Sequence, residues 1–120
     1  MLSNKGEVKM SDCVFCKIIN KDLPAKVIYE DFDLIAFHDI SPLAPVHVLI
    51  VPKKHVASIA DVEDGAVVAK AVMLAGKIAK ELGVAESGFR LVSNVGADGG
   101  QTVHHLHFHL LAGKALGSMC

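Results

Sequence analysis

The stretch that decides the fold reads QTVHHLHFHL and occupies residues 101–110. Its second half alternates histidines with apolar residues: His105, Leu106, His107, Phe108, His109 and Leu110. Successive side chains in a strand point to opposite faces, so this period of two predicts a strand over residues 104–111. Three imidazoles then line one face, about 6.5 Å apart at the rise of a strand, and three apolar side chains line the other.

Three histidines on one strand face indicate a chemical task. A single histidine on a strand is usually structural, but a polar ring repeated three times is costly to bury without a function. Neutral imidazoles at i and i+2 can bind zinc. Alternatively, one ring acts as a nucleophile while another moves protons, because imidazole titrates near neutral pH.

The loop before this strand favours the second task. Residues 94–102 read NVGADGGQT, with three glycines and the turn pair Asp98-Gly99. Glycines let backbone N–H groups approach a phosphate oxygen closely. Asp-Gly is also common in ordinary hairpin turns. The loop therefore points to phosphate chemistry only because the histidine-rich strand follows it directly.

The composition indicates one cytoplasmic domain that binds neither nucleic acid nor a membrane. The chain has 120 residues, with 12 basic and 13 acidic side chains and a net charge of -1, so it offers no surface suited to a polyanion. No apolar run approaches the roughly 20 residues of a membrane span, and no signal-peptide pattern is visible. Three cysteines, two of them in Cys13-x-x-Cys16, are not the framework of a secreted disulfide-bonded domain.

Turn signals and periodicity predict the remaining elements. We expect a disordered leader over residues 1–11, followed by a short helix that is capped by Ser11 or Asp12 and ends near Asn20. Further strands are expected over 27–30, 34–38, 46–51 and 89–94. A helical turn within 57–64 and a long helix over 65–82 lie between the third and fourth of these strands. Asp64 is suited to cap the long helix and Gly83 to end it. This order predicts an α+β fold with an antiparallel sheet.

The long helix predicts a partner chain. Its polar side chains Lys70, Lys77 and Glu81 form one narrow stripe, and most of the remainder is apolar. The chain as a whole is 52% apolar, which is high for a small monomer. We therefore expect one side of the helix to cover the sheet and another to contact a second copy in a homodimer.

The motif HLHFHLL at residues 105–111 resembles the histidine-triad motif, in which three histidines alternate with apolar residues. The chain is similar to the Hint branch of the histidine-triad (HIT) nucleotide-binding proteins from about Asp12 to Gly113. Further anchors are FCKII at 15–19, AFHDI at 36–40, PVH at 45–47, PKKH at 52–55 and GGQ at 99–101. The resemblance implies a HIT domain over residues 12–120, with a five-stranded antiparallel sheet, one long helix and a short N-terminal helix. It also implies a dimer that joins two such sheets.

The resemblance further implies a purine nucleoside phosphoramidate hydrolase that acts on nucleotides of the AMP and GMP type. His107 would attack the α-phosphorus and form a covalent nucleotidyl-histidine, which water then hydrolyses. The carbonyl of His105 would orient His107, His109 would donate hydrogen bonds to the phosphate and assist proton transfer, and His47 would support the triad. The uridylyltransferase branch has glutamine where this chain has His109, which favours hydrolysis over transfer.

The same resemblance assigns the nucleotide contacts. They are Phe15, Ile18, Phe37, His38, Asp39, Ile40, Asn94, Gly100, Gln101, Thr102 and Val103. Phe15 and Ile18 would line the adenine pocket, and Asp39 would bind the ribose hydroxyls, for which a carboxylate is a suitable bidentate acceptor. Asn94, Gln101 and Thr102 would hold the phosphoryl group and the leaving amine.

Cys13-x-x-Cys16 is half of a tetrahedral zinc site. Zinc-bearing relatives use the histidine after Pro-Lys-Lys and the first triad histidine, which here are His55 and His105. Such a zinc would be structural, and the chemistry at His107 would need no metal. The alternative is a pair of reduced thiols on a helix.

Two other functions are compatible with the sequence. One is a dimeric nucleotide-binding scaffold or regulator with little turnover, a role that would survive replacement of His107. The other is a zinc-dependent hydrolase with the metal on His105 and His107, which a chelator would inactivate without unfolding the chain.

Overall fold

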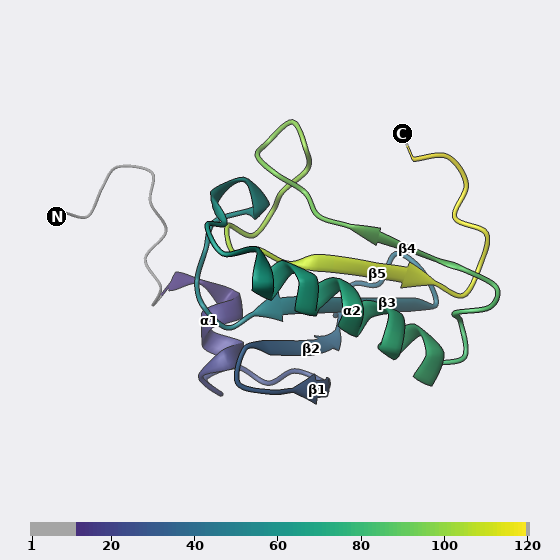
Figure 1. The fold of residues 1–120 in the computed structure, drawn as a ribbon, viewed down its shortest axis with the longest axis horizontal. Helices are drawn as coiled ribbons and strands as arrows, with labels where there is room; N and C mark the ends of the chain where they lie inside the picture. Colours follow the sequence, from purple (N-terminus) through teal and green to yellow (C-terminus); the bar gives the residue numbers. More distant parts are fainter. Residues whose placement is uncertain (1–11, 120) are drawn as a thin grey trace, which may run out of the picture.

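The computed structural model describes residues 12–119, so the predicted disorder of residues 1–11 lies outside the described part of the chain. The elements, in chain order, are α1 (Val14–Ile19), β1 (Val27–Glu30), β2 (Leu34–His38), β3 (Val46–Pro52), the 3-10 helix η2 (Ile59–Asp61), α2 (Gly65–Glu81), β4 (Phe89–Val92) and β5 (Phe108–Ala112). Figure 1 shows α2 lying across the sheet and α1 at one end of it. The predicted α+β fold with a five-stranded antiparallel sheet is confirmed.

The strand order β1-β2-β3-β5-β4 places β3, which carries His47, next to β5, which carries His109. Leu49 of β3 lies opposite His109 of β5, and His47 lies opposite Leu111. Residues opposite each other in an antiparallel pair share a face, as do residues two apart on one strand. His47 and His109 are therefore diagonal neighbours on the same face.

The sheet separates two apolar cores. The α2 side is filled by Leu34, Ala36, Val48, Ile50, Ala71, Leu74, Ala75, Ile78, Leu106, Phe108 and Leu110. The α1 side is filled by Cys13, Phe15, Cys16, Ile18, Ile35, Phe37, Leu49 and Val51. Alternate residues of β2 and β3 thus belong to different cores, which is why these two central strands read as almost continuous apolar runs.

The start of α1 differs from the prediction. Its N-cap is Cys13, whose Sγ accepts a hydrogen bond from the N–H of Cys16 at 3.4 Å, and not Asp12 or Ser11. A thiolate or thiol at the N-cap satisfies a backbone donor that the helix itself cannot use. The helix therefore begins directly between the two cysteines, and its first turn holds their sulfurs close together.

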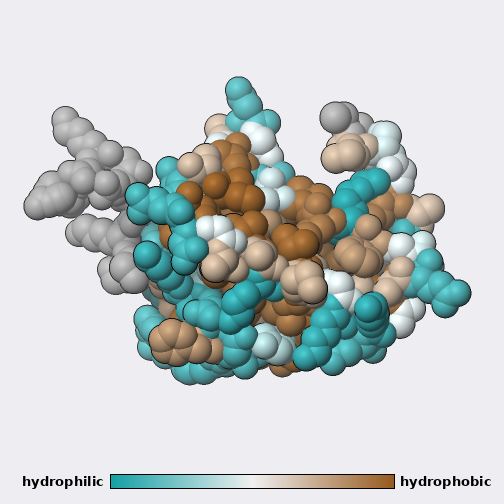
Figure 2. All heavy atoms as spheres, in the orientation of Figure 1, coloured by the Kyte–Doolittle hydropathy of each residue, from teal (hydrophilic) through white to brown (hydrophobic). Residues whose placement is uncertain are grey.

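Helix α2 agrees with the prediction at both ends. Oδ1 of Asp64 accepts from the N–H of Ala66 at 3.0 Å, and Gly83 has a φ of +75° just after the helix. Part of the exposed surface of α2 is apolar, with Met73 76% and Val72 46% exposed, and it lies next to the exposed polar stripe of Lys70, Lys77 and Glu81. Figure 2 shows apolar side chains gathered along this side of the molecule. Within residues 12–119, no helix combines the length and hydropathy that a membrane span requires.

The histidine-rich segment is less regular than predicted. Strand β5 begins at Phe108 and not at residue 104, and β4 ends at Val92 and not at residue 94. The backbone before β5 makes hydrogen bonds outside the sheet: the N–H of Leu106 donates to the carbonyl of Val56 at 2.7 Å. The alternation of faces nevertheless persists: His105 and His107 are buried on the α1 side, whereas Leu106 packs under α2.

Candidate active site

Three histidine rings meet on the α1 side of the sheet. His107 and His109 have ring centroids 4.9 Å apart, and His109 and His47 have centroids 5.2 Å apart. Phe15 of α1 packs edge-on against His107 at 4.9 Å. The antiparallel pairing of β3 and β5, together with α1 above it, therefore brings His47 to the triad as predicted.

A hydrogen bond to the main chain orients His107. Its Nδ1 lies 2.7 Å from the carbonyl oxygen of His105, so Nδ1 carries the proton and Nε2 keeps a free lone pair. The carbonyl of His107 in turn accepts from the hydroxyl of Ser93 at 3.1 Å. The ring that was predicted to be the nucleophile thus has the tautomer that a nucleophile requires.

A second chain of hydrogen bonds sets the tautomer of His109. The backbone N–H of Leu43 donates to Nδ1 of His47 at 3.0 Å, so the proton of a neutral His47 is on Nε2. That Nε2 lies 2.9 Å from Nδ1 of His109 and donates to it. His109 therefore carries its own proton on Nε2, which is available as a donor to a substrate.

Burial keeps these rings neutral. It lowers the pKa of His109 to about 4, with further lowering from the charges of His107 and His47. Burial also lowers the pKa of His107, against the opposing effects of the His105 carbonyl and the charge of Asp39. The pKa of His47 is lowered by burial too, again opposed by Asp39. At neutral pH, His107 therefore has its lone pair available without losing a proton first.

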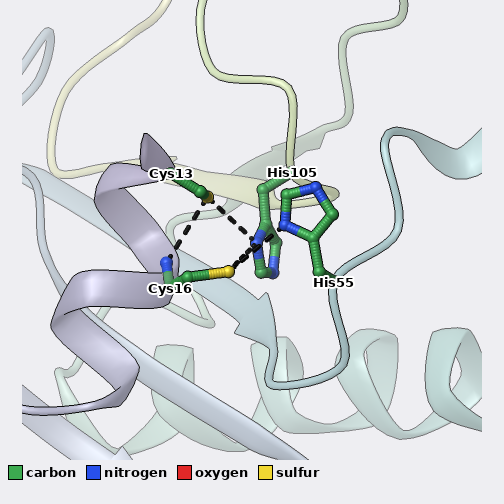
Figure 3. A group of neighbouring side chains, drawn as sticks. All are labelled: Cys13, Cys16, His55 and His105. Carbon is green, nitrogen blue, oxygen red and sulfur yellow. Dashed lines mark hydrogen bonds between the residues drawn. The ribbon is translucent and has the colours of Figure 1, made fainter. Parts of the chain in front are cut away.

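The four predicted metal ligands form one group (Figure 3). Sγ of Cys13 is 3.4 Å from Nδ1 of His105, and Sγ of Cys16 is 3.2 Å from Nδ1 of His55 and 3.6 Å from that of His105. With zinc bonds of about 2.3 Å to sulfur and 2.0–2.1 Å to nitrogen, ligands at tetrahedral angles are about 3.5 Å apart. The observed spacing fits a tetrahedral site closed by four protein ligands.

The surroundings of this group also suit a metal. Nε2 of His105 donates to the carbonyl of Pro52 at 2.7 Å, which leaves Nδ1 unprotonated and facing the sulfurs. Burial, then the hydrogen bond and charge of Cys13, raise the pKa of Cys16 to about 11. A metal cation bound between two buried thiols and two imidazoles would favour the thiolate form of the cysteines and balance their negative charge. Among the described residues, His107 belongs neither to this group nor to the one other group of possible metal ligands.

A second group of possible ligands, Asp39, His47 and His109, does not fit a metal. The two facing nitrogens are 2.9 Å apart, whereas two nitrogen ligands of tetrahedral zinc are about 3.3 Å apart. Metal on Nε2 of His47 would also place a proton on Nδ1, which already accepts the N–H of Leu43. The close contact is explained by a hydrogen bond.

Of the residues that the resemblance assigns to the nucleoside, some are buried in the core and others are exposed to solvent. Phe15, Ile18 and Phe37 belong to the core on the α1 side, and Val103 packs against it. Ile40 is 98% exposed, and His38 is also exposed. The structure thus brings Phe15, Ile18, Phe37 and Val103 together in one core, with Phe15 against His107, whereas His38 and Ile40 lie outside that core.

The glycine-rich loop is held by its own side chains. Nε2 of Gln101 donates to the carbonyls of Ala57 at 2.7 Å and Val103 at 3.0 Å, and its Oε1 accepts from the N–H of Gly96 at 2.9 Å. Nδ2 of Asn94 donates to the carbonyl of Gly99 at 2.7 Å. Both amides, expected to contact the phosphoryl group, thus shape the loop.

The conformation of that loop requires Gly99 and Gly100. A Cβ at Gly99 would lie 2.3 Å from the carbonyl oxygen of Val95, and Gly100 has a φ of +82°. Thr102 is exposed to solvent. The sequence pattern identified the glycines, but it missed Leu43 and Ser93, because a backbone N–H and a lone serine leave no signal in the sequence.

Comparison with known proteins agrees with this geometry. The HIT domain family model matches residues 20–116. The chain is 42% identical to the purine nucleoside phosphoramidase of Escherichia coli (strain K12) over 110 residues, which are 90% of this chain and 92% of the relative. The structure resembles that of a HIT family hydrolase from Clostridium thermocellum, with a TM-score of 0.87, 46% identity and coverage of 92% of this chain and 97% of that chain. A histidine triad protein from Clostridium difficile gives a TM-score of 0.88 at 47% identity, covering 92% and 98% of the two chains. The chain therefore belongs to the HIT, or histidine triad, family.

Proposed function

We propose that this chain hydrolyses the P–N bond of purine nucleoside 5′-phosphoramidates by way of a covalent adduct on His107. The observation that carries the proposal is the hydrogen bond of 2.7 Å from Nδ1 of His107 to the carbonyl of His105, which leaves Nε2 as an oriented nucleophile. A relative of 42% identity is a purine nucleoside phosphoramidase, which supports the substrate class.

The reaction has two displacements. In the first, Nε2 of His107 forms a bond to the α-phosphorus, the P–N bond to the leaving amine breaks, and the amine takes up a proton that His109 helps to deliver from solvent. In the second, water attacks the same phosphorus and gives up one proton to solvent, the bond to His107 breaks, and a nucleoside monophosphate is released. Splitting one displacement into two easier ones is the usual gain of covalent catalysis.

His109 serves both steps as a hydrogen-bond donor. Its Nδ1 is engaged by His47 at 2.9 Å, so its Nε2–H is the group left to contact a phosphoryl oxygen or the leaving group. A fixed donor aimed at developing negative charge is worth more in a buried site than in water. Thr102 and the backbone of Gly100 are the loop groups that we assign to the same oxygens.

The remaining assignments complete the substrate site. The aromatic faces of Phe15 and Phe37, whose centroids are 5.8 Å apart, together with Ile18, supply apolar surface for a purine. Asp39 accepts the ribose hydroxyls. His38, Ile40 and Val103 border the nucleoside, and Asn94 and Gln101 hold the loop in shape around the phosphate.

Zinc, a second copy of the chain and a cytoplasmic location belong to the same proposal. Cys13, Cys16, His55 and His105 would hold zinc, which would tie α1 to the sheet and leave the chemistry to His107. The apolar side of α2 would pack against a second copy, and the free edge of β4 would join the two sheets. Reduced thiols in a zinc site suit the cytoplasm.

The test is turnover of adenosine 5′-phosphoramidate, followed by chromatographic separation of AMP and the released amine. We expect hydrolysis by the wild-type protein, insensitive to brief treatment with a chelator, and severe loss in the His107→Ala variant. Tight binding of AMP without turnover, unchanged by His107→Ala, would instead identify a nucleotide-binding scaffold. Loss of activity on chelation with the fold retained would identify a zinc-dependent hydrolase.

A further inference from the structure

Asp39 makes three polar contacts, two of which are with His47. Its N–H donates to the carbonyl of His47 at 2.9 Å, and its Oδ1 accepts from the N–H of Ser41 at 2.7 Å. Its other oxygen, Oδ2, lies 3.5 Å from Nε2 of His47. The His47 side chain is 2% exposed and that of Asp39 is 18% exposed, so this charge acts on the ring with little screening by water.

Both nitrogens of His47 are engaged from the same short loop. Leu43, four residues after Asp39, donates its N–H to Nδ1 of His47 at 3.0 Å. The carboxylate of Asp39 faces Nε2, the nitrogen that carries the proton when Nδ1 is an acceptor. The loop therefore specifies one tautomer of His47 from two sides, and His47 passes that choice to His109 through a contact of 2.9 Å.

We propose that Asp39 is a positioning residue for His109, in addition to any contact that it makes with ribose. Its carboxylate holds the proton of His47 on Nε2 and secures the loop that presents the Leu43 N–H. His109 is thereby kept with Nδ1 as acceptor and Nε2–H as donor. This inference rests on the proposed function, because it gives the ribose-binding loop a role in the chemical step.

Asp39 can select these tautomers for the reason that applies to any site histidine held by a hydrogen-bonding partner. A neutral imidazole has two tautomers of similar energy, and the partner of one nitrogen decides where the proton resides. Besides Asp39, the titratable groups that face His109 are His47 and His107, and neither supplies a negative charge. Asp39 is thus the charged group that distinguishes the two ends of the His47–His109 pair.

The first experiment reads the tautomers directly. Two-dimensional ¹⁵N spectra of histidine side chains at neutral pH should show protonated Nε2 and unprotonated Nδ1 for both His47 and His109. In Asp39→Asn, and in Asp39→Ala if the first variant does not fold, both rings should become mixtures of tautomers. Asp22→Asn, which removes an exposed carboxylate after α1, should leave the spectrum unchanged. Unaltered tautomers in both Asp39 variants would overturn the inference.

The second experiment separates the chemical step from ribose binding. Wild type and Asp39→Asn are compared on adenosine 5′-phosphoramidate and on its 2′,3′-dideoxy analogue, which lacks the hydroxyls that a carboxylate would bind. On the dideoxy substrate we expect Asp39→Asn to retain the KM of wild type and to lose about tenfold in kcat, a typical effect of removing the outer partner of a site histidine. In a His47→Gln background, Asp39→Asn should cause no further loss of kcat on the dideoxy substrate.

Each outcome decides one claim. Equal kcat for wild type and Asp39→Asn on the dideoxy substrate would mean that Asp39 acts through ribose alone. An additional tenfold loss in the His47→Gln background would mean that its effect does not pass through His47. If wild type cleaves neither substrate, the proposed function fails, and the tautomer spectra still decide what Asp39 does to His47 and His109.

Discussion

The carbonyl oxygen of His105 accepts a hydrogen bond of 2.7 Å from the Nδ1–H of His107. Since His105 faces the sulfurs of Cys13 and Cys16 through its own Nδ1, one residue links the four possible metal ligands to the proposed nucleophile. The link is made by the main chain, so it orients the His107 ring without needing a metal in the reaction. The proposed function depends on this arrangement.

Stability should rise with pH through the weakly acidic range because of His109. Its folded-state pKa is about 4, whereas an unfolded histidine titrates near 6.5, so the unfolded chain binds more protons between these values. The contribution is fully present above about pH 6.5 and is lost as the pH falls toward 4. Urea unfolding at intervals from pH 4.5 to 7.5, with EDTA present, should give a shallower rise for His109→Gln than for wild type.

The matched control for this measurement is His104→Gln. His104 is exposed on the same segment, so its replacement should leave the rise of the unfolding free energy as in wild type. If His109→Gln and wild type have the same dependence between pH 4.5 and 6.5, burial does not hold His109 neutral in the folded chain.

Much of the sheet could be predicted from the sequence because its pattern is local. The strands over residues 27–30 and 34–38 and the long helix with its Asp64 cap agree with the structure to within a residue. The irregular backbone before Phe108 could not be predicted. It depends on bonds to Val56 and Ser93, which are remote in the chain.

The parts of the site made by reactive side chains could be predicted from the sequence, whereas the contacts made by the backbone could not. The sequence indicated the triad and the cysteine pair, and the resemblance supplied His47 and His55. The role of the Leu43 N–H in fixing the His47 tautomer has no counterpart in residue identity. The same holds for Cys13 as a helix cap, since cysteine is not among the residues that usually signal one.

One zinc per chain is expected from the spacing of the four ligand atoms. Protein purified without chelator should contain zinc near 1:1 by elemental analysis, and Cys13→Ser with Cys16→Ser should abolish it. Zinc at a thousand times its Kd stabilises a folded chain by about 4 kcal/mol, so the double variant should also melt at lower temperature. Cys120→Ser, which changes the third cysteine, should keep its metal. Zinc retained by the double variant would show that the ligands are assigned wrongly.

A homodimer is expected from the apolar side of α2. Light scattering at micromolar concentration should give twice the chain mass of 12.7 kDa, and Met73→Glu should shift the protein toward the monomer. The comparison is Phe32→Glu, which places the same charge on an apolar residue that is 92% exposed in the β1–β2 turn. A wild-type protein of 12.7 kDa alone, or equal effects of the two substitutions, would exclude α2 as the interface.

The two site histidines should differ in the size of their effects. His109→Ala removes a donor while Nε2 of His107 stays in place, so kcat should fall by about a hundredfold, as for loss of a general acid or base. His107→Ala and His107→Asn remove the attacking atom and should cost several orders of magnitude. Calorimetric titration with AMP should find binding largely retained in both. Equal losses in kcat at the two positions would mean that the two rings share the proposed roles.

The most direct test is to locate the covalent adduct. His109→Ala protein is mixed with adenosine 5′-phosphoramidate, quenched at alkaline pH, at which phosphorus–nitrogen bonds to histidine persist, digested and analysed by mass spectrometry. We expect an adenylyl group on His107 that disappears when His107 is also replaced by Ala. An adduct on His105 or His109, or full activity of His107→Ala in the otherwise wild-type chain, would contradict that expectation.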